Sequence, residues 1–201
     1  MLKKRIIPVL LISRNLLTKN KNFISDRTVG NIIQSVKVFN KRESDELTII
    51  DIDSSRGIES MDIGFLKEII AECGMPISAG GGIKTNTEIE KLLMIGFDKV
   101  IINNAFLMKP DFIEDSVKKF GSSSITIGID IVKKNHKFEL INKHNNKYTK
   151  KLSDWIEFAQ RKNVGEFFIT SVNHEGMMNG YDYDLLNYIH PLVNSPILFN
   201  G

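Results

Sequence analysis

Short apolar runs alternate along this chain with longer segments in which apolar residues recur at helical spacing. Seven apolar runs are typical of buried strands and cover residues 5–12, 47–52, 77–79, 100–102, 124–132, 167–170 and 196–199. Helical spacing predicts helices at 28–40, 61–73 (ended by Gly74), 85–95, 110–119, 153–161 and 182–189, and the polar segment 133–151 predicts a small hairpin. Apolar strands that alternate with helices predict an α/β protein with a parallel sheet covered by helices.

A glycine-rich segment at residues 76–83 is partly repeated at 196–201, after 196 − 76 = 120 positions. Residues 45–57 and 165–176 also match each other. Four strand–helix units in each half predict a (β/α)8 TIM barrel built from two half-barrel repeats. We therefore expect one barrel domain over residues 1–201, with half-barrels at 1–120 and 121–201, truncated after about the seventh strand. A doubly wound sheet is the alternative, but that fold does not require a duplicated glycine loop.

Composition narrows the class of protein. The 201 residues are 42% hydrophobic and 25% charged, as in soluble globular proteins, and the net charge of +3 gives no argument for nucleic acid. The single cysteine, Cys73, excludes an internal disulfide framework and predicts a cytoplasmic protein, and no apolar run has membrane-spanning length. The four histidines are scattered, so we expect no metal and no cofactor, and no serine, histidine and aspartate are assigned to one nucleophilic site.

Several motifs in chain order carry a resemblance to a known family. They lie at residues 4–8, 45–47, 80–83, 98–100, 102–103, 120–122, 129–130, 170–171 and 180–182. These motifs resemble those of HisF, the cyclase subunit (a lyase) of imidazole glycerol phosphate synthase in histidine biosynthesis. The resemblance implies a (β/α)8 barrel that receives ammonia from the glutaminase HisH at its N-terminal face. At the C-terminal face, that ammonia cyclises a bis-phosphorylated ribonucleotide.

The resemblance also implies two catalytic aspartates, and only one is present. Asp130 matches the catalytic aspartate of strand five, whereas Leu11 stands at the position of the strand-one aspartate. A leucine can neither give nor take a proton, so it cannot perform general acid–base catalysis. The segment 9–15 is instead similar to the glycosyl amidation-associated WbuZ-type subfamily, which is linked to surface-polysaccharide (lipopolysaccharide) sugars.

The WbuZ-like segment implies a subunit that conducts ammonia. It would pair with a HisH-like glutaminase as a heterodimer and feed a separate sugar amidotransferase. Two alternatives stay open: a true cyclase of the histidine pathway, and a barrel that only activates the glutaminase.

The resemblance implies sites at both ends of the barrel. Four charged residues match the family's ammonia gate, namely Arg5, Glu46, Lys99 and Glu166, and Asp98 matches a position at the glutaminase interface. The alternative for the gate is that charges at strand starts merely cap the barrel floor. Binding of a phosphorylated small molecule is implied for Lys19, Asp51, Gly81, Gly82, Asn103, Asn104, Glu175 and Gly176.

Each of the proposed phosphate contacts has a plainer interpretation. The glycines would also suit an ordinary strand–helix turn, Asp51 would also suit a polar core position, and Lys19 would also suit a solvated surface loop. The loop at 173–177 departs from the family pattern, because Glu175 replaces an aspartate and Met177 replaces a threonine.

Overall fold

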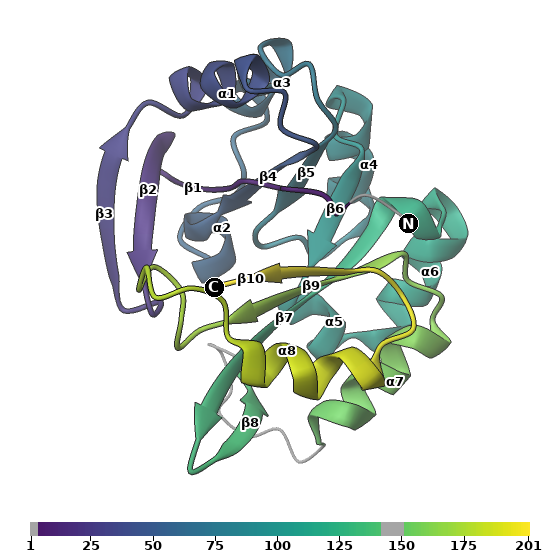
Figure 1. The fold of residues 1–201 in the computed structure, drawn as a ribbon. Coiled ribbons are helices and arrows are strands. Elements are labelled where there is room, and N and C mark those ends of the chain that lie inside the picture. The colour runs from purple at the N-terminus through teal and green to yellow at the C-terminus, as the bar shows by residue number, and fades with distance from the viewer. Residues whose placement is uncertain (1–3, 142–150) are drawn as a thin grey trace. The chain divides into compact units, whose positions relative to one another are not determined.

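The structure is a computed structural model that describes residues 4–141 and 151–201 (Figure 1). Contacts between residues divide the chain into two compact units. The first unit comprises Met1–Lys19 and Asp26–Ile101, and the second comprises Asn20–Ser25 and Ile102–Gly201.

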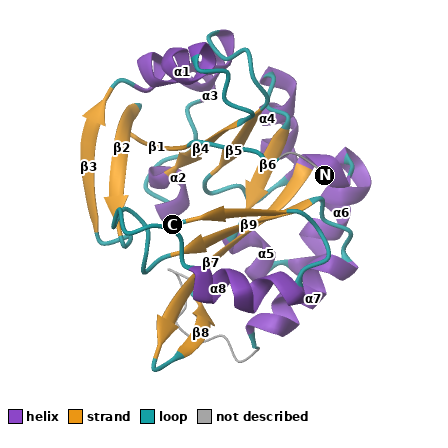
Figure 2. Cartoon of the chain, viewed as in Figure 1, coloured by secondary structure: helices purple, strands orange, loops and turns teal. Residues whose placement is uncertain are grey.

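The first unit is a largely parallel sheet with helices between its strands (Figure 2). The strand order is β6-β5-β4-β1-β2-β3; β1, β4, β5 and β6 run parallel, and β2 is antiparallel to β1. Its elements are β1 (Val9–Ser13), β2 (Leu16–Lys21), β3 (Ser25–Gly30), α1 (Ile32–Lys41), β4 (Leu47–Asp51), α2 (Ile52–Arg56), α3 (Ile63–Ala71), β5 (Ile77–Gly80), α4 (Asn86–Ile95) and β6 (Lys99–Ile102).

Local chemistry explains where these helices begin. Asn31 accepts hydrogen bonds from the first turn of α1, and Asp62 does the same for α3. Thr85 and Glu88 form a reciprocal capping box at the start of α4, which ends at Gly96 in the left-handed conformation. The core of the unit is apolar and includes Ile32, Val36, Leu47, Ile49, Leu66, Ile69, Ile89, Leu92 and Val100, all at most 2% exposed.

The second unit contains a parallel ladder of three strands in the order β10-β9-β7, with β8 antiparallel to β7. Phe106, Trp155 and Phe158 pack their rings together, with centroids 5.5–6.3 Å apart. Its elements are α5 (Asn104–Met108), α6 (Pro110–Phe120), the 3-10 turn η1 (Ser122–Ser124), β7 (Ile125–Lys134), β8 (Lys137–Leu140), α7 (Leu152–Arg161), β9 (Glu166–Ser171), α8 (Tyr183–Ile189), η2 (His190–Leu192) and β10 (Ile197–Asn200).

The predicted α/β class is confirmed, and the alternation of parallel strands with helices is that of a TIM-barrel-like fold. The two half-barrel repeats and the single barrel domain stay predictions. No helix in residues 4–141 or 151–201 combines the length and apolar character needed to cross a membrane. The hairpin predicted at 133–151 is confirmed as far as β7 and β8, and residues 142–150 lie outside the described part of the chain.

Several predicted boundaries were wrong. The first strand begins at Val9 rather than at Arg5, the helix predicted from residue 28 begins at Ile32, and α3 ends at Ala71 rather than at Cys73. The strands β2 and β3 were missed because four of the six residues of β2 are polar and every residue of β3 is exposed, so neither shows an apolar run. The short helices α2 and α5 were also missed, since five residues carry no measurable helical period.

Candidate functional site

Three of the four predicted gate residues form an ionic cluster in the first unit. Glu46 immediately precedes β4, and its Oε1 accepts a hydrogen bond from Nη1 of Arg5. Nζ of Lys99, the first residue of β6, lies 3.3 Å from Oε2 of the same glutamate. Only 10% of the Glu46 side chain is exposed, and a carboxylate so shielded from water is tolerated when cations surround it. The carboxylate of Glu46 therefore lies between two cations, beside the starts of β4 and β6.

Glu166 and Asp98, the other two charged residues predicted at that end of the strands, lie in other surroundings. Glu166 is the first residue of β9 in the second unit and is 8% exposed; its membership of the gate stays a prediction. Asp98 is exposed, and its Oδ2 accepts the N–H of Ile77 at 2.8 Å, just as Asp45 accepts the N–H of Ile6 at 2.8 Å. Asp98 thus ties neighbouring segments together, and its predicted role at a partner interface stays a prediction.

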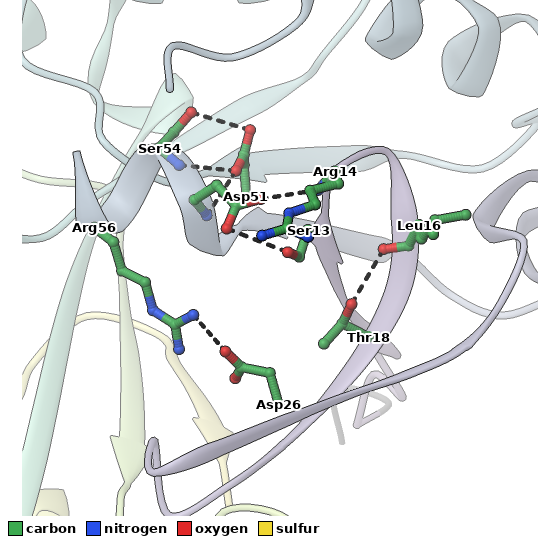
Figure 3. A network of polar contacts seen from close by, with 9 residues as sticks. Ser13, Arg14, Leu16, Thr18, Asp26, Asp51, Ser54 and Arg56 are labelled. Carbon is green, nitrogen blue, oxygen red and sulfur yellow. Dashed lines mark hydrogen bonds and ion pairs between the residues drawn. The ribbon is translucent and has the colours of Figure 1, made fainter. Parts of the chain in front are cut away.

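Asp51, at the end of β4, caps the short helix α2 (Figure 3). Its Oδ1 accepts the N–H groups of Asp53 at 3.0 Å and Ser54 at 2.9 Å, and its Oδ2 accepts the Ser54 hydroxyl at 3.0 Å. Burial raises the pKa of Asp51, while the hydrogen bonds from Ser54 act in the opposite direction. This geometry supports the plainer interpretation, a polar residue that holds loop amides, and contact with a ligand stays a prediction.

The glycine loop lies directly against the turn that Asp51 caps. A Cβ at Gly81 would lie 2.2 Å from the carbonyl oxygen of Asp51, and a Cβ at Gly82 would lie 2.4 Å from that of Ser54. Both glycines also have positive φ, +119° and +62°. Packing and backbone conformation therefore already require glycine at both positions, as an ordinary turn would. Phosphate binding by this loop stays a prediction.

The first unit adds one residue that sequence reasoning missed. Asp53 is 8% exposed and accepts hydrogen bonds from the Ser13 hydroxyl at 3.2 Å and the Arg14 N–H at 2.8 Å, which ties the end of β1 to α2. The one sequence signal for Asp53 was its position in a polar segment that directly follows an apolar strand. Lys19 is exposed but lies in β2, so its expected position in a loop was wrong.

In the second unit, four residues form a carboxylate cluster beside the carboxyl ends of β9 and β10 and the middle of β7. Asn103 donates from Nδ2 to Oδ2 of Asp130 at 2.9 Å, and Asn200 donates from Nδ2 to Oε2 of Glu175 at 2.8 Å. Asp130 and Asn200 both pair in register with Thr170, which places them in one row across three parallel strands. The fold thus brings together the predicted residues Asn103, Asp130 and Glu175, and it adds Asn200, which sequence reasoning missed.

The carboxylate cluster is rich in hydrogen-bond acceptors. Burial raises the pKa of Glu175, the hydrogen bond from Asn200 lowers it, and the charge of Asp130 raises it further. Among the described residues, Oδ1 of Asn103 is buried and has no hydrogen-bond donor. Two carboxylates that repel each other, one with a raised pKa, are an arrangement that can take up and release a proton.

The remaining predicted residues are placed as follows. Leu11 lies in the middle of β1 and pairs in register with Thr18 and Ile50. Asn104 is the first residue of α5, and Gly176 has a φ of +71° that suits its turn. Phosphate contacts by these last two residues stay predictions.

A serine, a histidine and an aspartate do meet in the second unit, contrary to the expectation from sequence. Oδ2 of Asp182 accepts the Ser171 hydroxyl at 2.8 Å and lies 3.2 Å from Nδ1 of His174. The serine is only 1% exposed and donates directly to the carboxylate. Nδ1 of His174 lies 3.3 Å from the serine Oγ as well, so a single ring nitrogen faces both groups and the histidine does not relay a proton between them. The cluster instead fixes Asp182, which caps α8 by accepting the N–H of Leu185 at 3.0 Å.

The described part of the chain offers no obvious metal centre. Within residues 4–141 and 151–201, no group of three or more histidine, cysteine, aspartate or glutamate side chains is placed to hold a metal ion. The expected absence of a metal or cofactor stays a prediction.

Comparison with known proteins matches the whole chain to one family. The family model described as "Histidine biosynthesis protein" matches residues 5–201. A Campylobacter jejuni protein named "Putative imidazole glycerol phosphate synthase subunit hisF2" is 37% identical over 201 residues, which cover 100% of this chain and 80% of that protein. The "Imidazole glycerol phosphate synthase subunit HisF" of Staphylococcus saprophyticus is 34% identical over 207 residues, which cover 100% of this chain and 81% of that protein.

Proposed function

The chain belongs to the histidine biosynthesis protein family and is HisF-like, and on this premise we propose that it conducts ammonia from a HisH-like glutaminase. The observation that carries the proposal is a contrast between two sites. The ionic cluster of Arg5, Glu46 and Lys99 is intact, whereas position 11, where the family resemblance expects a catalytic aspartate, is a leucine. A protein that retains the ammonia entrance but lacks a proton-transfer group is suited to delivery of ammonia rather than to cyclisation.

The partners follow from the same premise. Relatives are named as subunits of imidazole glycerol phosphate synthase, which supports a heterodimer with a HisH-like glutaminase at the end of the strands that carries Glu46. The WbuZ-like segment at 9–15 supports delivery to an amidotransferase that acts on a surface-polysaccharide sugar. We place this activity in the cytoplasm, since the single cysteine fits a reducing compartment.

The decisive experiment supplies the chain with the bis-phosphorylated ribonucleotide and ammonium chloride and measures formation of the imidazole ring. We expect little or no turnover, and substantial turnover would overturn the proposal. A second arm uses the complex with the glutaminase and the charge reversal Glu46→Lys. Ammonia transfer should fall relative to glutamine hydrolysis while binding of the glutaminase persists. If transfer simply tracks hydrolysis, the chain is an activator of the glutaminase and not a conduit.

One observation favours the second candidate, a true cyclase of histidine biosynthesis. The half-buried Glu175 shares the carboxylate cluster with Asp130, so a second acid is present near the predicted catalytic aspartate despite Leu11. If that acid replaces the missing one, Glu175→Gln should abolish ring formation that the unmodified chain carries out. Absence of ring formation in the unmodified chain excludes this candidate.

A further inference from the structure

A pocket of about 720 Å³ lies in the second unit between the β7–β8 hairpin, the loop after β9 and the start of α8 (Figure 1). We call it the hairpin pocket. Its lining includes none of the residues to which the family resemblance assigns catalysis, phosphate binding or the ammonia gate. The volume falls within the range of about 300–1,000 Å³ that is usual for small-molecule sites. The second unit therefore has room for a ligand outside the carboxylate cluster.

Opposite charges are paired at the hairpin pocket. Nζ of Lys133 lies 2.8 Å from Oδ2 of Asp184, and Nδ1 of His174 lies 3.2 Å from Oδ2 of Asp182. A charged ligand would have to break one of these pairs or enter without a counter-charge of its own, and either costs free energy. The hairpin pocket therefore favours a neutral ligand.

The fold sets the orientation of two polar side chains in the hairpin pocket. Oδ1 of Asn173 accepts the N–H of Lys133 at 2.7 Å, so its Nδ2 is the group left to donate to a ligand. Nδ1 of His174 faces the Asp182 carboxylate and the Oγ of Ser171, which both accept, so Nδ1 carries the proton and Nε2 is left as an acceptor. A fixed donor and a fixed acceptor suit hydroxyl groups, since each hydroxyl can both donate and accept.

Two tyrosines add apolar surface to the hairpin pocket. Tyr181 and Tyr183 line it and are 58% and 67% exposed. The ring of Tyr181 packs edge-on against Phe199, with centroids 6.1 Å apart, which holds it in place. An exposed tyrosine ring offers a flat apolar face with a hydroxyl at its edge. The C–H face of a sugar ring can stack on such a surface while the sugar hydroxyls reach the polar side chains around it.

We propose that the hairpin pocket binds a neutral oligosaccharide, with one sugar ring stacked on Tyr183 and its hydroxyl groups held by Asn173 and His174. Nδ2 of Asn173 donates to one hydroxyl oxygen, and another hydroxyl donates to Nε2 of His174. This binding goes beyond ammonia transfer and does not depend on it, because no residue of the ionic cluster takes part.

The test is saturation-transfer difference NMR on the full chain at about pH 7.5, where an ordinary histidine is neutral. The probes are the neutral disaccharides maltose, lactose and N,N′-diacetylchitobiose, and adenosine and inorganic phosphate serve as competitors. We expect saturable transfer to the ring C–H protons of at least one disaccharide, and neither competitor should displace it. Absence of saturable transfer to every disaccharide, or displacement by either competitor, overturns the inference.

Variants locate the bound disaccharide. Tyr183→Ala removes the stacking surface and should weaken binding by about three- to ten-fold, whereas Tyr183→Phe keeps the ring and should retain it. Asn173→Asp keeps an oxygen for the Lys133 N–H but removes the Nδ2 donor, and it should weaken binding by a similar factor. Phe120→Ala, which removes a half-buried ring at the end of α6, should leave binding unchanged.

The variants also decide the outcome if a disaccharide binds elsewhere on the chain. If Tyr183→Ala and Asn173→Asp both bind the disaccharide as tightly as the parent, the hairpin pocket is not its site and the inference fails. Both residues are exposed, so we expect both variants to fold, and thermal unfolding checks this. The result is independent of the cyclase and ammonia-transfer assays, because it requires neither the glutaminase nor the ribonucleotide.

Discussion

The side-chain amide of Asn103 donates a hydrogen bond to Oδ2 of Asp130 across 2.9 Å. Asn103 follows β6 directly and occupies the cap position of α5, yet it makes no cap hydrogen bond, because its side chain is directed to the carboxylate on β7. The amide therefore orients Asp130, which the family resemblance predicts to be a catalytic aspartate. What the chain can do chemically depends on whether a second acid works with this one.

Replacement of Leu11 by aspartate should restore cyclase activity if the missing carboxylate is the cause of its loss. We expect Leu11→Asp to raise the rate of ring formation by about 10²–10⁴-fold, the usual contribution of a proton-transfer group. The measurement is ribonucleotide turnover with ammonium chloride. The matched control is Leu11→Asn, which has similar shape and polarity but cannot exchange a proton. Equal rates for the two variants would show that proton transfer at position 11 is not what limits the chain.

The ionic cluster should contribute to stability as well as to the proposed transfer. Glu46→Gln leaves the Arg5 and Lys99 charges facing a neutral amide, and we expect unfolding in urea to require about 1–3 kcal/mol less free energy. The control is Glu72→Gln. It breaks the pair with Lys37, in which both side chains are 42% exposed, and should cost at most about 0.5 kcal/mol. Similar losses for the two variants would mean that the cluster is no stronger than a surface ion pair.

The glycine loop should tolerate no side chain, whatever it binds. Gly82→Ala would place a Cβ 2.4 Å from the Ser54 carbonyl oxygen, and we expect a loss of more than about 3 kcal/mol from this clash combined with positive φ. Gly57→Ala is the control, since Gly57 also has positive φ, +72°, but nothing lies within 4 Å of its Cβ position. It should cost only about 1 kcal/mol, the conformational contribution. Comparable losses in thermal unfolding would contradict the close packing against Ser54.

Glu175 should make stability depend on pH in a direction opposite to that of most carboxylates. Burial raises its pKa in the folded chain, so its contribution to stability is full below the unfolded pKa and is lost as the pH rises through the folded pKa. Glu175→Gln removes this loss. The variant should therefore gain stability relative to the parent as the pH rises from about 4 to 7, as measured by urea unfolding at each pH.

Glu114 provides a control, because its pKa is lowered and its effect on the pH dependence of stability is therefore opposite to that of Glu175. Hydrogen bonds from Lys118 and Lys162 lower its pKa to about 2, so its contribution is present above the unfolded pKa and is lost as the pH falls toward about 2. Glu114→Gln should accordingly lose stability relative to the parent at neutral pH, and the loss should vanish in acid. If both variants follow the same trend, the burial of Glu175 does not control its titration.

The regular elements were predictable because their signals are local. Thr85 or Asn86 was expected to open the helix predicted over 85–95 and Gly96 to close it; the structure confirms α4, which Thr85 caps and Gly96 ends in the left-handed conformation. The same local patterns established the α/β class and the family resemblance. By contrast, β2 and β3 carry no apolar run, so only their pairing beside β1 shows that they are strands.

The sequence by itself determined which segments are strands and helices over most of the chain and which family it belongs to, and it predicts that Leu11 stands where the family pattern has an acid. Only the tertiary structure decided that Glu175 joins Asp130, that Gly82 must pass close to Ser54, and that Thr48 is buried without a hydrogen-bond partner among the described residues. The physical reason is the distance along the sequence over which each kind of interaction acts. Capping and periodicity act between residues a few positions apart, whereas burial, carbonyl contacts and shifted pKa values depend on segments that the chain brings together from far apart in sequence.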